Sequence, residues 1–180
     1  MSRIAVFDLD GTLVDSDEAL AAPFVAHGVA RADVTFGHVL ADECDRLGMT
    51  VADYLALYDP AQVLPYAGVV ELLGRLDRWA VCSNKHADAG RAELAQFGWE
   101  PEVALFSEAF DGPKRLQPVL DALDLAPADV VFVGDTAHDR RVATEVGAPF
   151  ALAGWNPRAE AVPGDQVLHA PADLLDLLES

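Results

Sequence analysis

The stretch IAVFDLDGT, residues 4–12, decides the fold class of the chain. Its four apolar residues are followed by two aspartates and a glycine, which is typical of a strand buried on both faces of a parallel sheet. Three further apolar runs and one weaker run end in a similar way. They span residues 79–82, 130–133 and 150–152, with the weaker one at 103–106.

Helical patterns separate these runs. The spacing of apolar residues predicts helices over residues 68–77, 86–97, 113–124, 136–147 and 171–178. Strands that alternate with helices of this length indicate βαβ crossovers. We therefore predict an α/β fold built on a parallel sheet.

One segment breaks this alternation. Residues 17–65 contain no good strand but show two or three helical stretches, near 17–28, 34–47 and 50–58. Asp15, with Glu18 three positions later, resembles a capping box that would start the first of these helices. We predict a core domain of residues 1–16 and 66–180, interrupted by a small helical domain of residues 17–65.

Composition and charge exclude several classes of partner. Thirty acidic residues against twelve basic ones give a formal net charge of −18. Such a surface repels nucleic acid and anionic lipid, so we expect neither as a partner. Cys44 and Cys82 lie far apart in apolar contexts, which predicts free buried thiols rather than a disulfide or a zinc site. Because no segment is long enough for a signal peptide or a membrane span, we expect a cytoplasmic protein.

Polar residues follow the predicted strands. They are Asp8, Asp10, Ser83, Asn84 and Asp135, with Lys114 after the weaker strand. The carboxyl ends of parallel strands meet at one edge of a sheet, so these side chains should converge there. Carboxylates so close together need a cation among them, and oxygen ligands of this kind suit Mg²⁺. The pattern predicts a magnesium site beside an ammonium group and a hydroxyl group, which suits phosphoryl chemistry.

Four motifs, in order along most of the chain, resemble the haloacid dehalogenase superfamily in its phosphoglycolate-phosphatase-like branch. They are DLDGTLVDS at residues 8–16, Ser83-Asn84-Lys85, Lys114 in Gly112-Pro113-Lys114, and GDTAHD at residues 134–139. The resemblance implies a three-layer Rossmannoid core with a short all-helical cap inserted after the first strand. The usual third motif has a proline directly after the lysine, where this chain has Arg115.

The resemblance also implies a role for each motif residue. Asp8 would be the nucleophile that forms an aspartyl-phosphate, and Asp10 the general acid and base. The phosphate-binding residues would be Ser83, Asn84 and Lys114. The Mg²⁺ ligands would be Asp8, Asp10 through its backbone carbonyl, Asp135 and Asp139, the last either directly or as an outer-shell anchor. Lys85 either faces substrate or is solvated, and we expect its loss to matter less than that of Lys114.

These features predict a Mg²⁺-dependent hydrolase of a small phosphorylated metabolite. A phosphomutase would share all four motifs, and a catalytically silent phosphate-binding or regulatory protein could use the same residues. A dehalogenase of the superfamily lacks an aspartate at the position of Asp10, which disfavours it here. The cap candidates for reading the substrate are His27, Arg31, His38, Arg46, Tyr54 and Tyr58. The cap has no lysine, so a second anionic group would need arginine or histidine.

Overall fold

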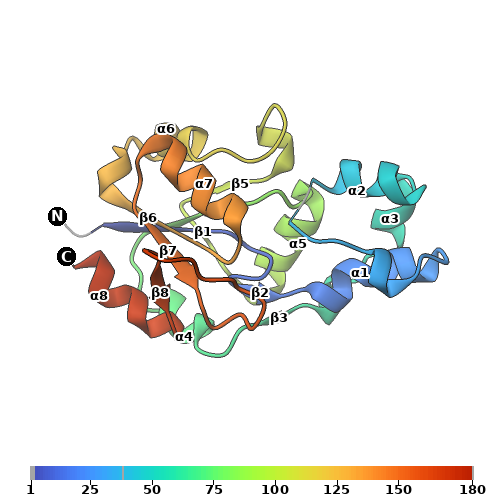
Figure 1. The fold of residues 1–180 in the computed structure, drawn as a ribbon, viewed down its shortest axis with the longest axis horizontal. Coiled ribbons are helices and arrows are strands. Elements are labelled where there is room, and N and C mark those ends of the chain that lie inside the picture. Colours follow the sequence, from blue (N-terminus) through green and yellow to red (C-terminus); the bar gives the residue numbers. More distant parts are fainter. Residues whose placement is uncertain (1–2, 38, 180) are drawn as a thin grey trace.

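The computed structural model describes residues 3–37 and 39–179, and Figure 1 shows a sheet flanked by helices. The strands of the sheet are β1 (Ile4–Phe7), β4 (Trp79–Cys82), β5 (Val103–Leu105), β6 (Val130–Gly134), β7 (Phe150–Ala153) and β8 (Gln166–Leu168). They pair in parallel in the order β5-β4-β1-β6-β7-β8. The predicted α/β fold is confirmed, with β1 at the centre of the sheet.

Helices cover both faces of the sheet. One face packs against α4 (Val69–Leu73), α5 (Ala87–Phe97) and α8 (Leu174–Leu178), and the other against α6 (Gln117–Leu123) and α7 (Ala137–Val146). Successive residues of β1 alternate between the two cores, because Phe7 packs into the first and Val6 into the second. Full burial of a side chain such as Phe7 contributes roughly 1.5–3 kcal/mol. The three layers predicted by the resemblance are therefore present.

A helical insertion follows β1 and contains α1 (Asp17–Ala26), α2 (Leu40–Leu47) and α3 (Val51–Leu57). Figure 1 shows these helices at the right, beyond the carboxyl end of β1. They enclose a small core of their own, made by Ala21, Phe24, Val34, Cys44, Met49 and Tyr54. The chain leaves and re-enters the core domain through β2 (Val14–Asp15) and β3 (Leu64–Pro65), which pair antiparallel. We propose that this ribbon marks the domain boundary, with residues 17–65 as the cap.

Short 3₁₀ turns complete the secondary structure. They are Arg31–Asp33, Pro60–Gln62, Ser107–Ala109, Pro127–Asp129 and Pro171–Asp173. The last of these precedes α8, so the helix predicted over residues 171–178 begins as a 3₁₀ turn. In the described part of the chain, no helix is long and apolar enough to cross a membrane. Cys44 and Cys82 are free and buried, as predicted.

Several local predictions were wrong. Asp15 lies in β2, and the N-cap of α1 is Ser16, which makes no side-chain capping bond, so the predicted capping box does not form. The helix predicted from residue 34 begins at Leu40. Lys114 lies in a loop, because α6 begins only at Gln117, directly before a proline that favours a helix start. The strands β2, β3 and β8 were missed because two or three residues show no usable period.

Candidate active site

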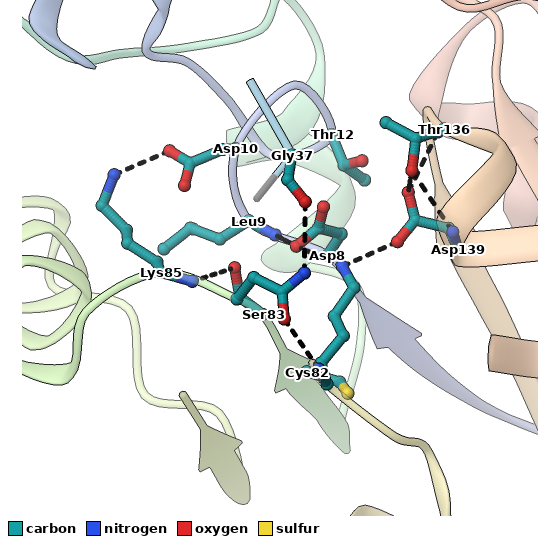
Figure 2. A network of polar contacts seen from close by, with 12 residues as sticks. Asp8, Leu9, Asp10, Thr12, Gly37, Cys82, Ser83, Lys85, Thr136 and Asp139 are labelled. Carbon is teal, nitrogen blue, oxygen red and sulfur yellow. Dashed lines mark hydrogen bonds and ion pairs between the residues drawn. The ribbon is translucent and has the colours of Figure 1, made fainter. Parts of the chain in front are cut away.

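The carboxyl ends of β1, β4 and β6 bring the predicted residues to one edge of the sheet. Asp8 directly follows β1, Ser83 follows β4 and Asp135 follows β6. Since β1 pairs with both β4 and β6, Asp8 lies between the other two strand ends. Figure 2 shows Asp8 at the centre, with Asp10 and Lys85 on one side and Asp139 with Thr136 on the other.

Asp8, Asp135 and Asp139 form a buried acidic cluster. One carboxylate oxygen from each lies within 4.8 Å of the others. Burial raises the pKa of Asp8 to about 6, against the opposing charge of Lys114. Burial, together with the charges of Asp8 and Asp139, raises the pKa of Asp135 to about 7. Ionised carboxylates in this arrangement need a further positive charge, so the cluster fits a divalent cation.

Asp135 is positioned by neutral donors. The Thr12 hydroxyl donates to its Oδ1 at 3.3 Å, and Asn156 Nδ2 donates to its Oδ2 at 2.9 Å. Gly11 has φ +78°, and a Cβ there would lie 2.4 Å from Asp135 Oδ2, so only glycine fits. Among residues 3–37 and 39–179, Asp135 makes no ion pair. Its carboxylate is therefore suited to a metal ion.

Lys114 lies between two acids of the cluster. Its Nζ is 2.9 Å from Asp8 Oδ1 and 2.6 Å from Asp139 Oδ1. Burial lowers the pKa of Lys114, but the charges of Asp139 and Asp8 outweigh burial and raise it above its usual value. The Lys114 backbone N–H donates to Asn84 Oδ1 at 2.7 Å, and Asn84 Nδ2 donates to the Gly37 carbonyl at 3.2 Å. Asn84 thus connects the Lys114 loop to the cap.

Asp139 lies in the first turn of α7 and also holds Lys114. Its Oδ2 accepts from the Thr136 N–H at 2.9 Å and from the Thr136 hydroxyl at 2.6 Å. In return the Thr136 hydroxyl accepts from the Asp139 N–H, which completes a capping box. The pKa of Asp139 is lowered, because Lys114 and Thr136 overcome the effect of burial. Asp139 is thus an ionised, fully buried partner of Lys114.

Lys85 is buried, so the solvated alternative for this residue was wrong. Its Nζ is 2.7 Å from Asp10 Oδ1 and 2.8 Å from Glu93 Oε1. The Tyr58 hydroxyl, from the end of α3, donates to the same Glu93 oxygen. The Ser16 hydroxyl donates to Asp10 Oδ1 at 2.5 Å. Asp10 is therefore held by one cation and one hydroxyl, and Lys85 connects it to the cap through Glu93.

The sequence analysis did not identify Ser16, Glu93 and Asn156 as site residues. It expected Tyr58 to read the substrate, whereas the Tyr58 hydroxyl binds Glu93. Glu93 carried a signal, because it occupies the buried face of α5 next to Leu94. Asn156 follows the end of β7, where the strand-end rule applies as well. Nothing in the residues around Ser16 indicates that its hydroxyl binds Asp10 instead of capping α1.

Ser83 is buried at the floor of the site. Its Oγ accepts from the Lys85 N–H at 3.3 Å, and its own N–H donates to the Leu105 carbonyl at 3.0 Å. The N-cap of α5 is His86, so Ser83 does not cap that helix. Its hydroxyl hydrogen is directed by whatever acceptor enters the site.

The site opens into a cleft of about 340 Å³ between the sheet edge and the cap. Asp8, Asp10 and Lys114 line it on the core side, and Leu20 and Phe36 line it on the cap side. Clefts of roughly 300–1,000 Å³ are typical of small-molecule sites. The acidic cluster and Lys114 thus face a space of substrate size.

Comparison with known proteins identifies the group to which this site belongs. No protein-family model matches the chain. The curated protein named "Probable phosphatase IndB", from Dickeya dadantii, is 31% identical over 191 residues, which cover 86% of this chain and 82% of that protein. The phosphoglycolate phosphatase of Rhodospirillum rubrum is 29% identical over 201 residues, covering 90% of this chain and 83% of that protein.

This chain belongs to the haloacid dehalogenase (HAD) superfamily. Within it, the chain is phosphoglycolate-phosphatase-like. The relatives that match it over nearly its whole length are phosphatases. A solved structure from Geobacter sulfurreducens, described as a HAD-superfamily hydrolase of subfamily IA, superposes with a TM-score of 0.78 at 20% identity. The superposition covers 99% of this chain and 100% of the Geobacter sulfurreducens chain. The chain is accordingly a HAD-like hydrolase of the phosphatase type.

The irregular third motif of this HAD chain does not displace its lysine. Arg115 stands where the usual pattern has proline, yet Lys114 Nζ still reaches Asp8 and Asp139. The Asn84 side chain holds the Lys114 backbone in place.

Proposed function

We propose that this chain is a Mg²⁺-dependent phosphomonoester hydrolase that acts on a small metabolite through an aspartyl-phosphate on Asp8. The observation that carries the proposal is the arrangement around Asp8. Lys114 Nζ lies 2.9 Å from Asp8 Oδ1, and the Leu9 N–H donates to the same oxygen at 2.8 Å. Both contacts use Oδ1, so Oδ2 is the candidate nucleophilic atom.

The first half-reaction transfers the phosphoryl group to the protein. Asp8 attacks phosphorus in line with the ester bond, and that P–O bond breaks as the new bond forms. Asp10 gives its proton to the departing ester oxygen. Lys114 and the Ser83 hydroxyl bind the phosphoryl oxygens, where they offset the negative charge.

The second half-reaction restores Asp8. Asp10, now ionised, takes a proton from a water molecule, and the oxygen of that water attacks the phosphorus of the aspartyl-phosphate. The bond between phosphorus and Asp8 breaks, which releases inorganic phosphate and the free carboxylate. Asp10 therefore has to stay in one place while its proton leaves and returns. Lys85 and Ser16, both bonded to its Oδ1, would supply that constraint.

The residues that would hold Mg²⁺ are Asp8, the backbone carbonyl of Asp10, and Asp135. Bound there, the ion would screen the carboxylates from the phosphate dianion and stabilise charge on the transferring group. Asp139 has Lys114 on one oxygen and Thr136 on the other. We therefore give it the outer role, in which it anchors Lys114. Asn84 would also have an indirect role in phosphate binding, because its side chain holds the loop that carries Lys114.

The test is release of inorganic phosphate from 4-nitrophenyl phosphate by the purified protein. Activity should disappear in excess chelator and return with added Mg²⁺. Asp8→Asn should abolish turnover and the acid-labile phosphoenzyme, whereas Asp45→Asn, on the exposed face of α2, should change neither. Undiminished turnover in chelator would contradict the magnesium mechanism. A phosphomutase would instead leave the phosphoryl group on the organic product without phosphate release.

A further inference from the structure

The cationic side chains that could read a second anionic group of the substrate are already paired. In the cap, Arg31 pairs with Glu18 at 2.9 Å and Arg46 with Glu43 at 2.6 Å. Neither arginine, nor His27, is among the described residues that line the cleft. His38 lies outside the described residues. The cap arginines proposed from the sequence therefore do not face the space where a leaving group would lie.

The basic side chains on the core side of the cleft are engaged as well. Lys85 and Lys114 each lie between two carboxylates, and in the proposed mechanism Lys114 is already used by the transferring phosphoryl group. Two arginines also line the cleft: Arg140 pairs with Asp165 at 2.6 Å, and Arg158 pairs with Asp17 at 2.5 Å. The lining histidines, His86 and His138, contact Glu108 and Arg141. Among the described residues, each lysine and arginine that lines the cleft is paired with an acid. His138 has no acidic partner in the ion pairs of that part of the chain, but burial and the charge of Lys114 lower its pKa, so it adds no cation.

The cap wall of the cleft offers apolar surface instead. Four half-buried side chains line it, namely Leu20, Phe36, Leu40 and Tyr58. The hydroxyl of Tyr58 is bonded to Glu93, and that of Tyr54, which also lines the cleft, donates to the Leu20 carbonyl at 3.0 Å. Both tyrosines therefore present ring atoms to the cleft.

Acidic groups accompany this apolar wall. Asp17 and Glu43 line the cleft from the cap. The pKa of Glu43 is lowered, because its bonds with Arg46 and Thr35 overcome burial, so it carries negative charge. A second anionic group on the substrate would lose hydration against apolar atoms, and the ion pairs of Asp17 and Glu43 offer it no net positive charge in return.

We infer that the leaving group of the substrate is uncharged and partly apolar, of the size of a substituted ring or a short branched chain. The substrates are then phosphate monoesters of neutral alcohols or phenols rather than esters that carry a carboxylate or a second phosphate. This inference rests on the proposed function, since it concerns the alcohol that Asp10 would protonate. The inferred substrates exclude phosphoglycolate, which carries a carboxylate and gives the Rhodospirillum rubrum relative its name.

The experiment compares two esters of nearly equal shape and leaving-group chemistry, 4-methylphenyl phosphate and 4-carboxyphenyl phosphate, with 2-phosphoglycolate as a third substrate. With Mg²⁺ present, kcat/KM should be at least ~10-fold higher for the methyl ester, since a single well- or ill-matched group in a pocket changes selectivity about 10–200-fold. Equal or better hydrolysis of the carboxylate esters overturns the inference and leaves the proposed function intact. If no ester released phosphate, 4-nitrophenyl phosphate included, both the inference and the proposed function would be contradicted.

A matched pair of variants tests the reason for the preference. Asp17→Asn removes the partner of Arg158 inside the cleft, whereas Glu18→Gln removes the partner of Arg31 outside it. The first variant should shift the ratio of the two kcat/KM values toward 4-carboxyphenyl phosphate by about 10-fold. The second should leave the ratio unchanged. A ratio that does not move in Asp17→Asn, or moves equally in Glu18→Gln, contradicts the claim that paired cations set the specificity.

Discussion

Lys114 and Lys85, the only lysines of the sequence, are both buried, and each lies between two carboxylates. The two lysines differ in the domains that their ion-pair partners contact. Lys114 contacts Asp8 and Asp139, which both belong to the core domain. Lys85 contacts Asp10 and Glu93, and Glu93 also accepts a hydrogen bond from Tyr58 of the cap. The ion pairs of Lys114 are therefore confined to the core, whereas those of Lys85 are joined to the cap through Tyr58.

This difference assigns a separate counter-ion to each of the two aspartates of the first motif. Asp8 and Asp10 are two residues apart, yet each has its own lysine. Removing one lysine therefore leaves the other aspartate with its own cation. The comparison therefore predicts that the two lysines affect different properties of the reaction.

The largest effect should come from Lys114→Met. The variant leaves Asp8 and Asp139 without their cation and removes the positive charge that faces the phosphoryl group. A cation that stabilises a transferring phosphoryl group is worth roughly 10³–10⁵-fold in kcat. We expect a loss of that size on aryl and alkyl phosphates alike, measured by steady-state phosphate release with circular dichroism as the folding control. A loss confined to alkyl esters would assign Lys114 to the acid instead of the nucleophile.

Asp10→Asn should come second, and its effect should depend on the leaving group. General acid–base catalysis contributes about 10²–10⁴-fold, and an activated aryl phosphate needs little protonation of its leaving oxygen. We expect the larger loss on benzyl phosphate and the smaller loss on 4-nitrophenyl phosphate. The measurement is the ratio of the two kcat values in variant and wild type. An equal loss on both esters would show that Asp10 is not the acid.

The strand-end residues could be predicted because buried parallel strands leave a direct record in the sequence. An apolar run that stops at a polar residue fixes both the strand and its carboxyl end, so Asp8, Ser83 and Asp135 converge as expected. No comparable sequence pattern indicates which residues contact Lys85. Tyr58 reaches Glu93 only because the cap folds back over α5, and the sequence does not say where a loop returns. Asp15 was misassigned for the same reason, since its pairing with Leu64 lies 49 positions away along the chain.

Lys85→Met should have a smaller effect on the reaction and a clear effect on stability. Because Lys85 acts on phosphate only through Asp10, we expect kcat to fall roughly 10–100-fold on benzyl phosphate, below the full worth of a general acid, and little on 4-nitrophenyl phosphate. Glu93 is fully buried, and breaking a buried pair costs about 3–5 kcal/mol. Thermal unfolding should therefore shift clearly, and Lys85→Met combined with Glu93→Gln should regain stability without regaining kcat.

The exposed pair of Arg78 and Glu102 supplies the control for that experiment. Arg78→Met also removes a cation from a carboxylate, but both side chains are well exposed. Its melting temperature and its benzyl-to-nitrophenyl ratio should equal those of the wild type. If Lys85→Met gave the same ratio as the wild type, Lys85 would be a structural residue without influence on Asp10.

The acids of the cluster should differ in the pH dependence of stability that they cause, because the pKa of Asp8 and Asp135 is raised and that of Asp139 is lowered. Asp135 makes no ion pair among the described residues, and its pKa is raised to about 7 by burial and by Asp8 and Asp139. A carboxyl with a raised pKa binds its proton more tightly in the folded state, so its contribution is full below pH 4 and is lost as pH rises through about 7. In chelator, the melting temperature should fall between pH 5 and 8, by about 2–4 °C for each kcal/mol lost. Asp135→Asn should flatten this slope, and a slope unchanged in that variant would contradict the assignment.

The smallest expected effect is that of salt, and it follows from the pairing of both lysines. The net charge is −18, so the long-range field of the protein opposes an incoming phosphate ester. Attraction then comes from contacts inside the cleft, which salt screens little, whereas the repulsion acts over the Debye length of about 30 Å at 0.01 M and about 10 Å at 0.1 M. Raising the salt over that range should leave kcat/KM unchanged or raise it, by no more than about 2-fold, because only the weak outer field is removed. The wild type and Lys85→Met should respond equally, since the charge of Lys85 is already balanced by Asp10 and Glu93. A fall in kcat/KM with salt would mean that an unpaired cation steers the substrate, which would contradict both the comparison of the lysines and the neutral leaving group inferred from the cleft.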